Sequence, residues 1–273
     1  MDAAAPRVNQ SGAGANGAVP AISVRHLKMG YGKRVLLDDA SFDVKRGEIM
    51  VILGGSGCGK SSLMKNIIGL YEPMAGDILI RGKSIVKASA AEKAGLQRSL
   101  GVMYQSGALF GSLNVLENVR FPLDQFTNLG LASKNLTARM LLRQVEMGPA
   151  ESLMPGELSG GMLKRAGIAR AMALGCNIMM LDEPSAGLDP ITAANLDRTI
   201  LTLRKSLGLT FVVVTHELQS IFTIADRAIM LDPVSRSILA EGNPADLRGH
   251  SRDPRVRQFF NRVPDVDTQT AGS

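Results

Sequence analysis

The sequence contains no apolar run long enough to cross a membrane. A helix that spans a bilayer needs about 20 apolar residues, whereas the most apolar stretches here, at 49–53, 178–181 and 211–214, are the length of strands. The first residues are rich in Ala, Gly, Asn and Ser and lack the apolar core of a secretory signal. We therefore expect a cytoplasmic protein that needs a partner to attach to a membrane.

Cysteine and histidine are also scarce. Cys58 and Cys176 are too few for a disulfide framework. The three histidines, His26, His216 and His250, lie far apart, so the sequence indicates no Cys/His cluster for a structural metal.

Positive charge is in excess but is not concentrated. The net charge of +6 is compatible with nucleic acid or an anionic membrane surface as a partner. However, the 31 Lys and Arg residues are scattered and form no long basic block. We interpret them as a solvated surface and predict no nucleic-acid partner.

The 273 residues contain no internal repeat and one phosphate-loop pattern, so we predict a single domain with lobes. Residues 1–20 show no hydrophobic periodicity and are expected to form a disordered leader. Short alternating segments within 22–51, joined by 78–80, predict antiparallel strands. The stretch from about 108 to 163 has helical periodicity punctuated by Pro122, and we expect a helical subdomain there.

After this stretch, strands and helices alternate. Apolar strand-like runs and helical segments follow one another at 178–181, 191–207, 210–214, 218–225 and 228–231. Such alternation predicts a mainly parallel sheet covered by helices on both faces. The main domain is expected to extend over 21–250, followed by a C-terminal tail at 251–273.

A glycine-rich segment follows the apolar run at 49–53 and precedes a helical segment. It matches the phosphate-loop template with the residues Gly54, Gly55, Ser56, Gly57, Cys58, Gly59, Lys60 and Ser61. Glycines let backbone N–H groups approach phosphate oxygens, and the following helix directs its positive end at the same anion. Lys60 is expected to reach the β- and γ-phosphates, and the Ser61 hydroxyl to bind Mg²⁺. The pattern predicts that the chain binds a nucleoside triphosphate.

Two carboxylates stand at the end of the run 178–181, and ligands in open α/β sheets bind at that edge. Asp182 is expected to hold Mg²⁺, directly or through water. Glu183 is expected to orient or deprotonate the attacking water. His216 follows the apolar run 211–214 and is expected at the same edge of the sheet.

A second pattern for binding an anion lies between the phosphate loop and the two carboxylates. Ser159 has the form of a helix N-cap, and the following Gly160 and Gly161 leave N–H donors free. The chain thus carries one more phosphate cradle than a single nucleotide needs.

The pentapeptide LSGGM at 158–162, between the phosphate loop and Asp182, resembles the signature of the ATP-binding cassette (ABC) family, and the resemblance covers about 24–247. It implies an α/β fold in which a P-loop NTPase (RecA-like) core carries an antiparallel β subdomain and an inserted helical subdomain. It also implies ATP and Mg²⁺ as cofactors, and ATP hydrolysis coupled to transport.

The resemblance implies roles for further residues. Gln105 is implied to contact Mg²⁺ and the attacking water, and His216 to contact the γ-phosphate. Tyr31 matches the aromatic residue that stacks on adenine, and Ser62 a residue that touches the α- or β-phosphate. Asp189 closes a loop that crosses the interface of a dimer.

In this family each signature caps the γ-phosphate that the opposite subunit holds, which accounts for the second cradle. We therefore expect a homodimer in which two chains, related head to tail, enclose two ATP molecules. Loss of the γ-phosphate weakens this clamp and makes the dimer a ligand-driven switch.

The switch is expected to move integral membrane permease subunits that dock at 106–110 and 115–123. The strings at 105–110, 114–119 and 253–259 resemble the ATPases of bacterial Mla-type phospholipid transporters. This resemblance implies a peripheral position at the cytoplasmic face of the bacterial inner membrane. It also implies an Mce-type lipid-binding protein and a small accessory subunit as partners, and a C-terminal tail that reaches the partner subunit.

Two alternatives stay open. In one, the transporter imports amino acids or other small polar solutes instead of a lipid. In the other, the chain is a soluble ABC ATPase that acts on nucleic acid or ribosomes. Proteins of that second kind usually carry two cassettes, coiled-coil insertions or zinc modules, and the sequence has none of these.

Overall fold

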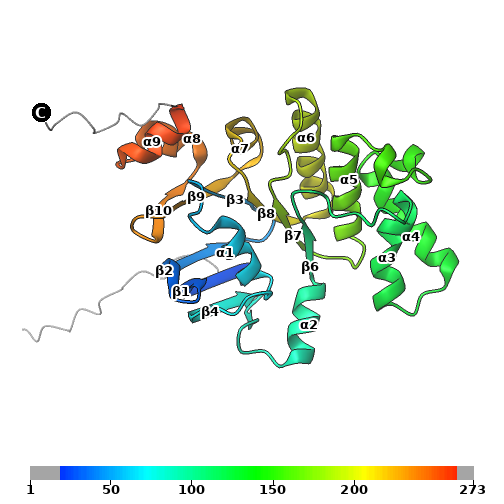
Figure 1. Ribbon diagram of the computed structural model, residues 1–273, viewed down its shortest axis with the longest axis horizontal. Helices are drawn as coiled ribbons and strands as arrows, with labels where there is room; N and C mark the ends of the chain where they lie inside the picture. The colour runs from blue at the N-terminus through cyan, green and yellow to red at the C-terminus, as the bar shows by residue number, and fades with distance from the viewer. Residues whose placement is uncertain (1–18, 263–273) are drawn as a thin grey trace, which may run out of the picture.

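The computed structural model describes residues 19–262, which form two β-sheets and the helices around them (Figure 1). The expected leader at 1–20 lies outside the described residues except for its last two positions. The last part of the expected tail, 263–273, lies outside them as well.

The smaller sheet is antiparallel and has the strand order β2-β1-β4-β5. Its strands are β1 (Ile22–Tyr31), β2 (Arg34–Val44), β4 (Ala75–Ile80) and β5 (Lys83–Ser84). The separate short segments expected within 22–51 include two parts of the single strand β2. Register shifts in its pairing with β1 interrupt the alternation from which strands are recognised in a sequence.

The larger sheet has the strand order β10-β9-β3-β8-β7-β6. Its strands are β3 (Ile49–Gly54), β6 (Leu100–Met103), β7 (Ile178–Asp182), β8 (Thr210–Val214), β9 (Arg227–Asp232) and β10 (Ser237–Gly242). Five neighbouring strands are parallel, and β10 runs antiparallel to β9. Because β3, β8 and β7 are adjacent, their carboxyl ends meet at one edge, where α/β proteins bind ligands.

The central strand β3 is buried on both faces and contributes to two cores. Val51 belongs to the core that contains residues of α5 (Gly160–Ala171) and α6 (Pro190–Leu207), whereas Met50 belongs to the core with α1 (Lys60–Ile67) and the smaller sheet. A strand covered on both faces is apolar throughout. The predicted α/β core with a sheet covered on both sides is confirmed.

Helical elements form a lobe beside the larger sheet, at the right of Figure 1: α3 (Val115–Phe126), α4 (Leu131–Gln144), the 3₁₀ turns η1 (Gly148–Ala150) and η2 (Pro155–Glu157), and part of α5. Asn114 caps α3 by accepting a bond from the Glu117 N–H, and the Glu117 carboxylate accepts one from the Asn114 N–H. Pro122 was expected to interrupt the helical stretch, but α3 continues through it. Val119 and Leu123, on either side of it, are both buried and hold the helix against the lobe.

The sequence patterns do not indicate several elements that the structure contains: α2 (Ala90–Arg98), β10, α8 (Pro244–His250) and α9 (Pro254–Asn261). The α9 helix falls within the expected C-terminal tail, yet its Val256 and Phe260 are buried. The Phe260 ring packs on Phe222 of α7 (Leu218–Ile224) with ring centroids 5.7 Å apart. The first part of the tail therefore packs on the main domain.

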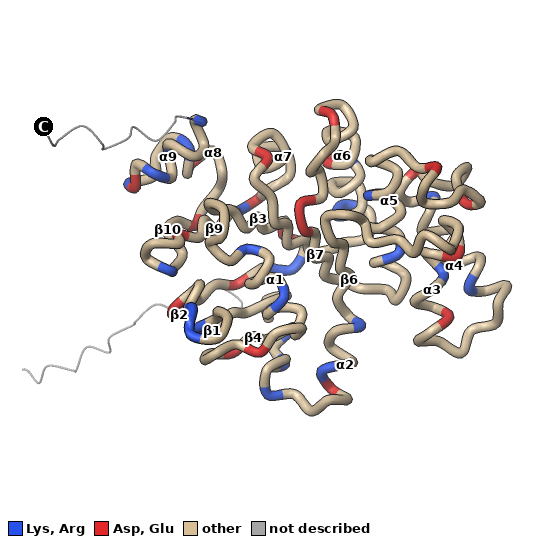
Figure 2. The backbone as a smooth tube through the Cα atoms, in the orientation of Figure 1, with Lys and Arg blue, Asp and Glu red and all other residues tan. Residues whose placement is uncertain are grey.

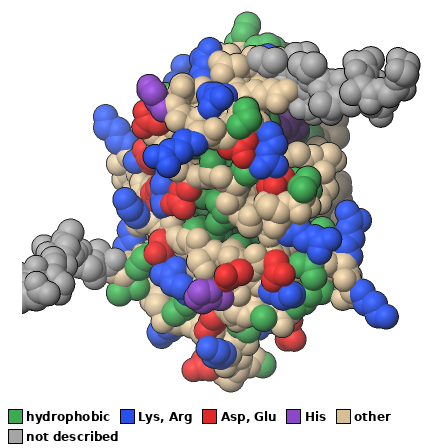
Figure 3. All heavy atoms as spheres, turned by 90° about the vertical axis from the view of Figure 1, so that its left-hand side faces the viewer, with side chains coloured by type: hydrophobic (Ala, Val, Ile, Leu, Met, Phe, Trp, Pro, Cys, Tyr) green, Lys and Arg blue, Asp and Glu red, His purple; other side chains and the backbone are tan. Residues whose placement is uncertain are grey.

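Acidic and basic side chains are interspersed over the surface. Figure 2 shows both along many of the elements, and Figure 3 shows both on the face at the left of Figure 1. Within residues 19–262, no helix combines the length and apolarity needed to cross a bilayer. The same residues contain no cluster of three or more His, Cys, Asp or Glu side chains that could hold a metal ion.

Asp197 on α6 is a buried carboxyl group outside the candidate site. Burial raises its pKa to about 6, and the Ser220 hydroxyl of α7 opposes the rise. Because this value exceeds the unfolded pKa of about 4, the folded chain keeps a proton that the unfolded chain releases. The stability that this proton provides is complete below pH ~4 and is lost as the pH rises through the folded-state pKa.

We predict that Asp197→Asn stabilises the chain by about 1–3 kcal/mol at pH 8 and by less at pH 4.5, because asparagine avoids a buried negative charge. Urea unfolding at the two pH values measures this difference, with the exposed Asp246→Asn as a control. An equal effect of Asp197→Asn at both pH values contradicts the raised pKa.

Candidate functional site

The phosphate loop connects β3 to α1, as the sequence predicts. Gly54, Gly57 and Gly59 have φ angles of 147°, 75° and 103°, a region that residues with a Cβ rarely adopt. A Cβ atom on Gly54 would also lie 2.5 Å from the Leu231 carbonyl oxygen and 2.7 Å from the Cys58 sulfur. The turn therefore requires glycine, and the buried Cys58 fills the space against it.

The start of α1 offers free donors to an anion. Its N-cap is Gly59, and no side chain of the described residues caps it, so its first N–H groups have no intrahelical partner. Lys60 Nζ bends back and donates to the carbonyl oxygens of Gly54 at 2.8 Å and Gly55 at 3.2 Å. An ammonium group held beside free N–H donors fits the phosphates of a nucleoside triphosphate.

Asp182 at the end of β7 faces the start of α1, where Ser61 Oγ lies 3.4 Å from Asp182 Oδ1. Burial raises the pKa of Asp182, and repulsion from Glu183 adds to the rise. Ser61 and the ammonium groups of Lys65 and Lys60 oppose it. A carboxylate that is costly to ionise gains from a nearby cation. The hydroxyl and the carboxylate thus fit the predicted Mg²⁺ ligands, completed by phosphate and water oxygens.

Glu183 is held by its main chain and by one carboxylate oxygen. Its φ of 46° is left-handed, and its N–H donates to the Val214 carbonyl of β8 at 2.8 Å. Glu183 Oε1 lies 2.9 Å from His216 Nδ1. Glu183 Oε2 is buried and has no hydrogen-bond partner among the described residues. Because an unpaired buried carboxylate oxygen is costly, this oxygen is suited to accept a hydrogen bond from a water molecule.

Tyr31 lies at the end of β1, beside the phosphate loop. It is 48% exposed, and its hydroxyl lies 2.6 Å from Ser62 Oγ. Its ring packs edge-on against Tyr71, with centroids 5.7 Å apart. The structure therefore brings Tyr31 and Ser62 together and leaves part of the tyrosine ring free to stack on a base.

Ser159 is the N-cap of α5, and its hydroxyl accepts a hydrogen bond from the Met162 N–H at 3.3 Å. A Cβ atom on Gly161 would lie 2.4 Å from the Thr192 side chain of α6. Gly160 and Ser159 are exposed. The glycine at 161 thus lets α5 start close to α6, and the exposed start of α5 lies on a different element from the phosphate loop.

Asp189 has a local role that the sequence analysis did not identify. Its Oδ1 accepts hydrogen bonds from the Ile191 and Thr192 N–H groups of α6, at 3.1 and 3.0 Å. The Thr192 side chain, and after it the N–H groups of Thr192 and Ile191, lower the pKa of Asp189. The carboxylate therefore caps α6, and its position at a dimer interface stays a prediction.

Residues of four predicted motifs border one open hollow of about 660 Å³: Ser61, Gln105, Gly160 and Asp182. The sequence analysis missed Lys65, Tyr104 and Lys164, which line the same hollow. Lys65 has a detectable signal, since it follows Ser61 by one turn on α1. Tyr104 directly precedes Gln105 after β6, whereas Lys164 reaches the hollow only because α5 packs on the core.

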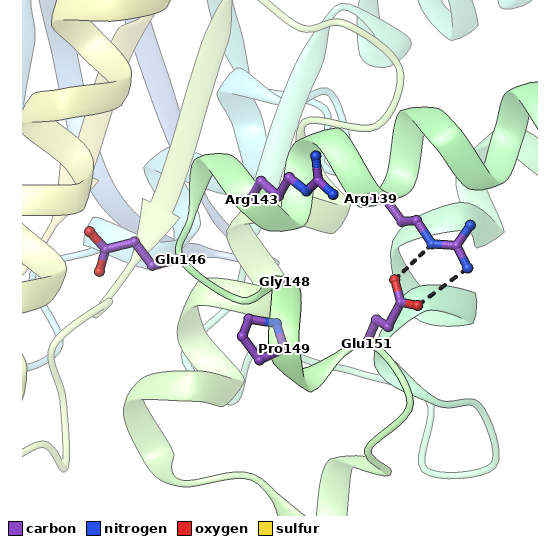
Figure 4. Close-up of a pocket in the computed structure, with 6 residues that line it drawn as sticks. All are labelled: Arg139, Arg143, Glu146, Gly148, Pro149 and Glu151. Atoms are coloured by element: carbon purple, nitrogen blue, oxygen red, sulfur yellow. Dashed lines mark hydrogen bonds and ion pairs between the residues drawn. The ribbon is translucent and has the colours of Figure 1, made fainter.

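Another cavity, of about 620 Å³, lies in the helical lobe between α4 and η1 (Figure 4). There the Arg139 guanidinium donates to Glu151 at 2.8 and 3.2 Å, and Arg143 lies beside this pair. None of the residues that line this cavity belongs to the predicted motifs. The candidate site is therefore the hollow beside the phosphate loop.

Comparison with known proteins agrees with this assignment. The model of the family described as ABC transporter matches residues 37–186, which include the phosphate loop, the signature and the two carboxylates. The chain is 39% identical over 244 residues to the intermembrane phospholipid transport system ATP-binding protein MlaF of Escherichia coli K12, covering 89% of this chain and 90% of that protein. It is also 39% identical to the probable ribonucleotide transport ATP-binding protein mkl of Mycobacterium leprae, covering 91% and 72%.

Solved structures share the fold. CbiO1 of Clostridium perfringens, part of the ABC transporter complex cbiONQ, matches with a TM-score of 0.78 and 27% identity, covering 90% of this chain and 96% of that one. The ATP-binding cassette MJ0796, solved as a dimer with ADP and Pi, matches with a TM-score of 0.73 and 26% identity, covering 81% and 98%. The predicted cassette fold, with its core, antiparallel sheet and helical lobe, is confirmed.

Proposed function

The chain belongs to the ABC transporter family, and from this membership we propose that it is the ATPase subunit of a bacterial transporter that moves phospholipids between membranes. The chain is an ATP-binding subunit that hydrolyses ATP, as its family implies. The observation that carries the lipid assignment is the identity of 39% to MlaF across 89% of this chain and 90% of that protein.

We assign ATP binding to the phosphate loop and the tyrosine beside it. The free N–H groups at the start of α1 and the Lys60 ammonium hold the phosphates. Ser62 touches the α- or β-phosphate, and the exposed part of the Tyr31 ring stacks on adenine. Tyr31, Lys60 and Ser62 line the same pocket, which supports a single binding mode.

Ser61 and Asp182 are the proposed ligands of Mg²⁺, with Gln105 at the border of the same hollow. The bound ion neutralises charge on the β- and γ-phosphates. The raised pKa of Asp182 supports this role, because a carboxylate destabilised by burial and by Glu183 is stabilised by a cation.

Glu183 is the proposed group that orients or deprotonates the attacking water. Its Oε1 is engaged by His216, so the unpaired Oε2 is the oxygen that accepts a bond from the water. His216 holds the carboxylate in place, and its ring is exposed enough to reach the γ-phosphate as well. Hydrolysis of this kind depends on positioning and charge neutralisation more than on covalent chemistry.

We propose that two chains form a homodimer in which Ser159, Gly160 and Gly161 of one chain cap the γ-phosphate held by the other. The presence of two phosphate cradles on separate elements supports this arrangement. A dimeric cassette among the structural relatives supports it as well. Binding of ATP then closes the dimer, and hydrolysis opens it.

The partners that we propose are integral membrane permease subunits, an Mce-type lipid-binding protein and a small accessory subunit. The permease is proposed to dock at 106–110 and 115–123, where Phe110 is 45% exposed and packs on Phe121. Such exposed apolar anchors fit a short helix of a partner. The chain would then lie at the cytoplasmic face of the bacterial inner membrane.

The names of the relatives give two different cargoes. The proteins named as ribonucleotide transporters are matched over 72% or 66% of their length. MlaF proteins are matched over 90% and 91% of theirs. The match that spans nearly the whole of both chains favours phospholipid as the cargo.

The test is transport by the chain purified together with its membrane partner and reconstituted in vesicles. We expect ATP-dependent transfer of a fluorescent phospholipid to acceptor vesicles. Lys60→Ala should abolish it, and Lys205→Ala, an exposed lysine on α6, should not. Uptake of a ribonucleotide or an amino acid without lipid transfer contradicts the lipid assignment. Absence of ATP hydrolysis by the wild-type complex contradicts the ATPase role.

A further inference from the structure

Side chains of α5, the helix that begins with the signature, donate hydrogen bonds to main-chain carbonyls of the segment 105–108, which follows β6. Lys164 Nζ donates to the Gln105 carbonyl oxygen. Further along α5, Arg170 donates to the carbonyl oxygens of Ala108 at 2.6 Å and Gly107 at 3.2 Å. Two cations of one helix thus bind three carbonyls of this segment, so that α5 and the Gln105 segment are tied to each other.

Lys164 makes one more contact that Arg170 does not make. Its Nζ also donates to the main-chain carbonyl of Glu183 at 3.2 Å. Lys164 is only 6% exposed, and a buried ammonium group is stable only where acceptors surround it. The two carbonyls provide that environment. One side chain therefore joins the signature helix, the Gln105 segment and the residue proposed to act on water.

The contact between Lys164 and the Glu183 carbonyl helps to fix the main-chain conformation that orients the Glu183 side chain. Glu183 has a left-handed φ of 46°, which a non-glycine residue keeps only when its surroundings hold it there. Its N–H is held by Val214, and its carbonyl is held by Lys164 and by the Ala186 N–H at 3.2 Å. Of these contacts, the one from Lys164 comes from the signature helix α5, whereas the others come from β8 and from the loop that follows Glu183.

We propose that Lys164 is a positioning residue that couples the signature helix to Glu183 of the same chain. Lys164 lies one helical turn after Gly160. When Gly160 of a chain caps the neighbour's ATP, the position of α5 is set by that contact, and Lys164 passes it on to the carbonyl of its own Glu183. Each site thus senses whether the other is filled. The inference rests on the proposed dimer.

The test uses Lys164→Met, which keeps the length of the side chain but removes its donors, and Lys164→Arg, which keeps a cation. We expect Lys164→Met to lower kcat for ATP by about 10–100-fold, as for a misplaced catalytic group. KM should change by less than about twofold, because the donors of Lys164 are engaged by the Gln105 and Glu183 main-chain carbonyls. Lys164→Arg should recover most of the lost rate. Lys134→Met removes a lysine paired with Asp124 at 3.3 Å in the same lobe and is the matched control.

A second measurement separates positioning from support of the signature. In a Glu183→Gln background, where ATP is bound but not hydrolysed, Lys164→Met should leave the amount of retained ATP unchanged. Loss of retained ATP overturns the inference, since the lysine would then serve the signature cradle. If Lys164→Met does not fold, Lys164→Gln, whose polar side chain is uncharged and too short to reach both carbonyls, is measured instead and should show the same fall in kcat with unchanged KM.

Failure of the inference is distinguishable from failure of the proposed function. If the wild-type chain hydrolyses ATP and the Lys164→Met chain has the same kcat, only the role of Lys164 is rejected. A wild-type complex without ATP hydrolysis rejects the proposed function itself.

Discussion

A Glu183→Gln chain is expected to bind ATP as the wild type does and to hydrolyse it about 100–10,000-fold more slowly. Glutamine has the shape of glutamate and can still contact His216, but it cannot accept a proton from water. The unpaired Oε2 in the structure is the atom whose basicity the substitution removes. With hydrolysis blocked, ATP stays in place and holds the dimer closed.

Single-turnover hydrolysis of labelled ATP, together with the amount of ATP retained after gel filtration, measures both parts of this prediction. Glu217→Gln is the matched control, because Glu217 is the next carboxylate to His216 but lies 3.7 Å from its Nε2 and is 44% exposed. Normal turnover by Glu183→Gln would remove this residue from its proposed role.

The second prediction with a large effect is that each site combines the phosphate loop of one chain with the signature of the other. Dimers of two differently substituted chains test it. Lys60→Ala destroys the phosphate loop, and Ser159→Arg blocks the signature. When the two changes are on different chains, one composite site keeps both an intact phosphate loop and an intact signature. When both are on the same chain and its partner is wild type, each composite site carries one defect.

We therefore expect single-turnover hydrolysis with about half of the wild-type amplitude from the dimer with the changes on different chains, at a reduced rate because its other site is empty, and almost none from the dimer with both on one chain. Sites formed within a single chain predict the reverse pattern. The comparison holds the two substitutions constant and changes only their distribution, so a general loss of folding cannot produce it.

Much of the site was predictable because its chemistry is local in the sequence. The phosphate loop needs Gly54, Gly57 and Gly59 for its turn, and these glycines mark it in the sequence. Asp182 and Glu183 follow a run that is apolar because the strand is buried on both faces. Adjacent parallel strands then bring such residues to one edge of the sheet without further information.

The remaining features depend on contacts between distant segments. Lys164 binds a carbonyl 59 residues away and another 19 residues away, and neither periodicity nor a motif indicates such pairs. The left-handed conformation of Glu183 is held by those neighbours and leaves no local signal. The α9 helix packs through Phe260 on Phe222, far earlier in the chain, and no local pattern indicates that contact.

The most direct test of the account is a structure of the Glu183→Gln assembly with ATP and Mg²⁺ bound. In the proposed dimer, Gly160 and Gly161 of each chain lie against the γ-phosphate of the ATP that the phosphate loop and Lys60 of the opposite chain hold. Two ATP molecules that each contact a single chain, with these glycines facing solvent, would contradict it.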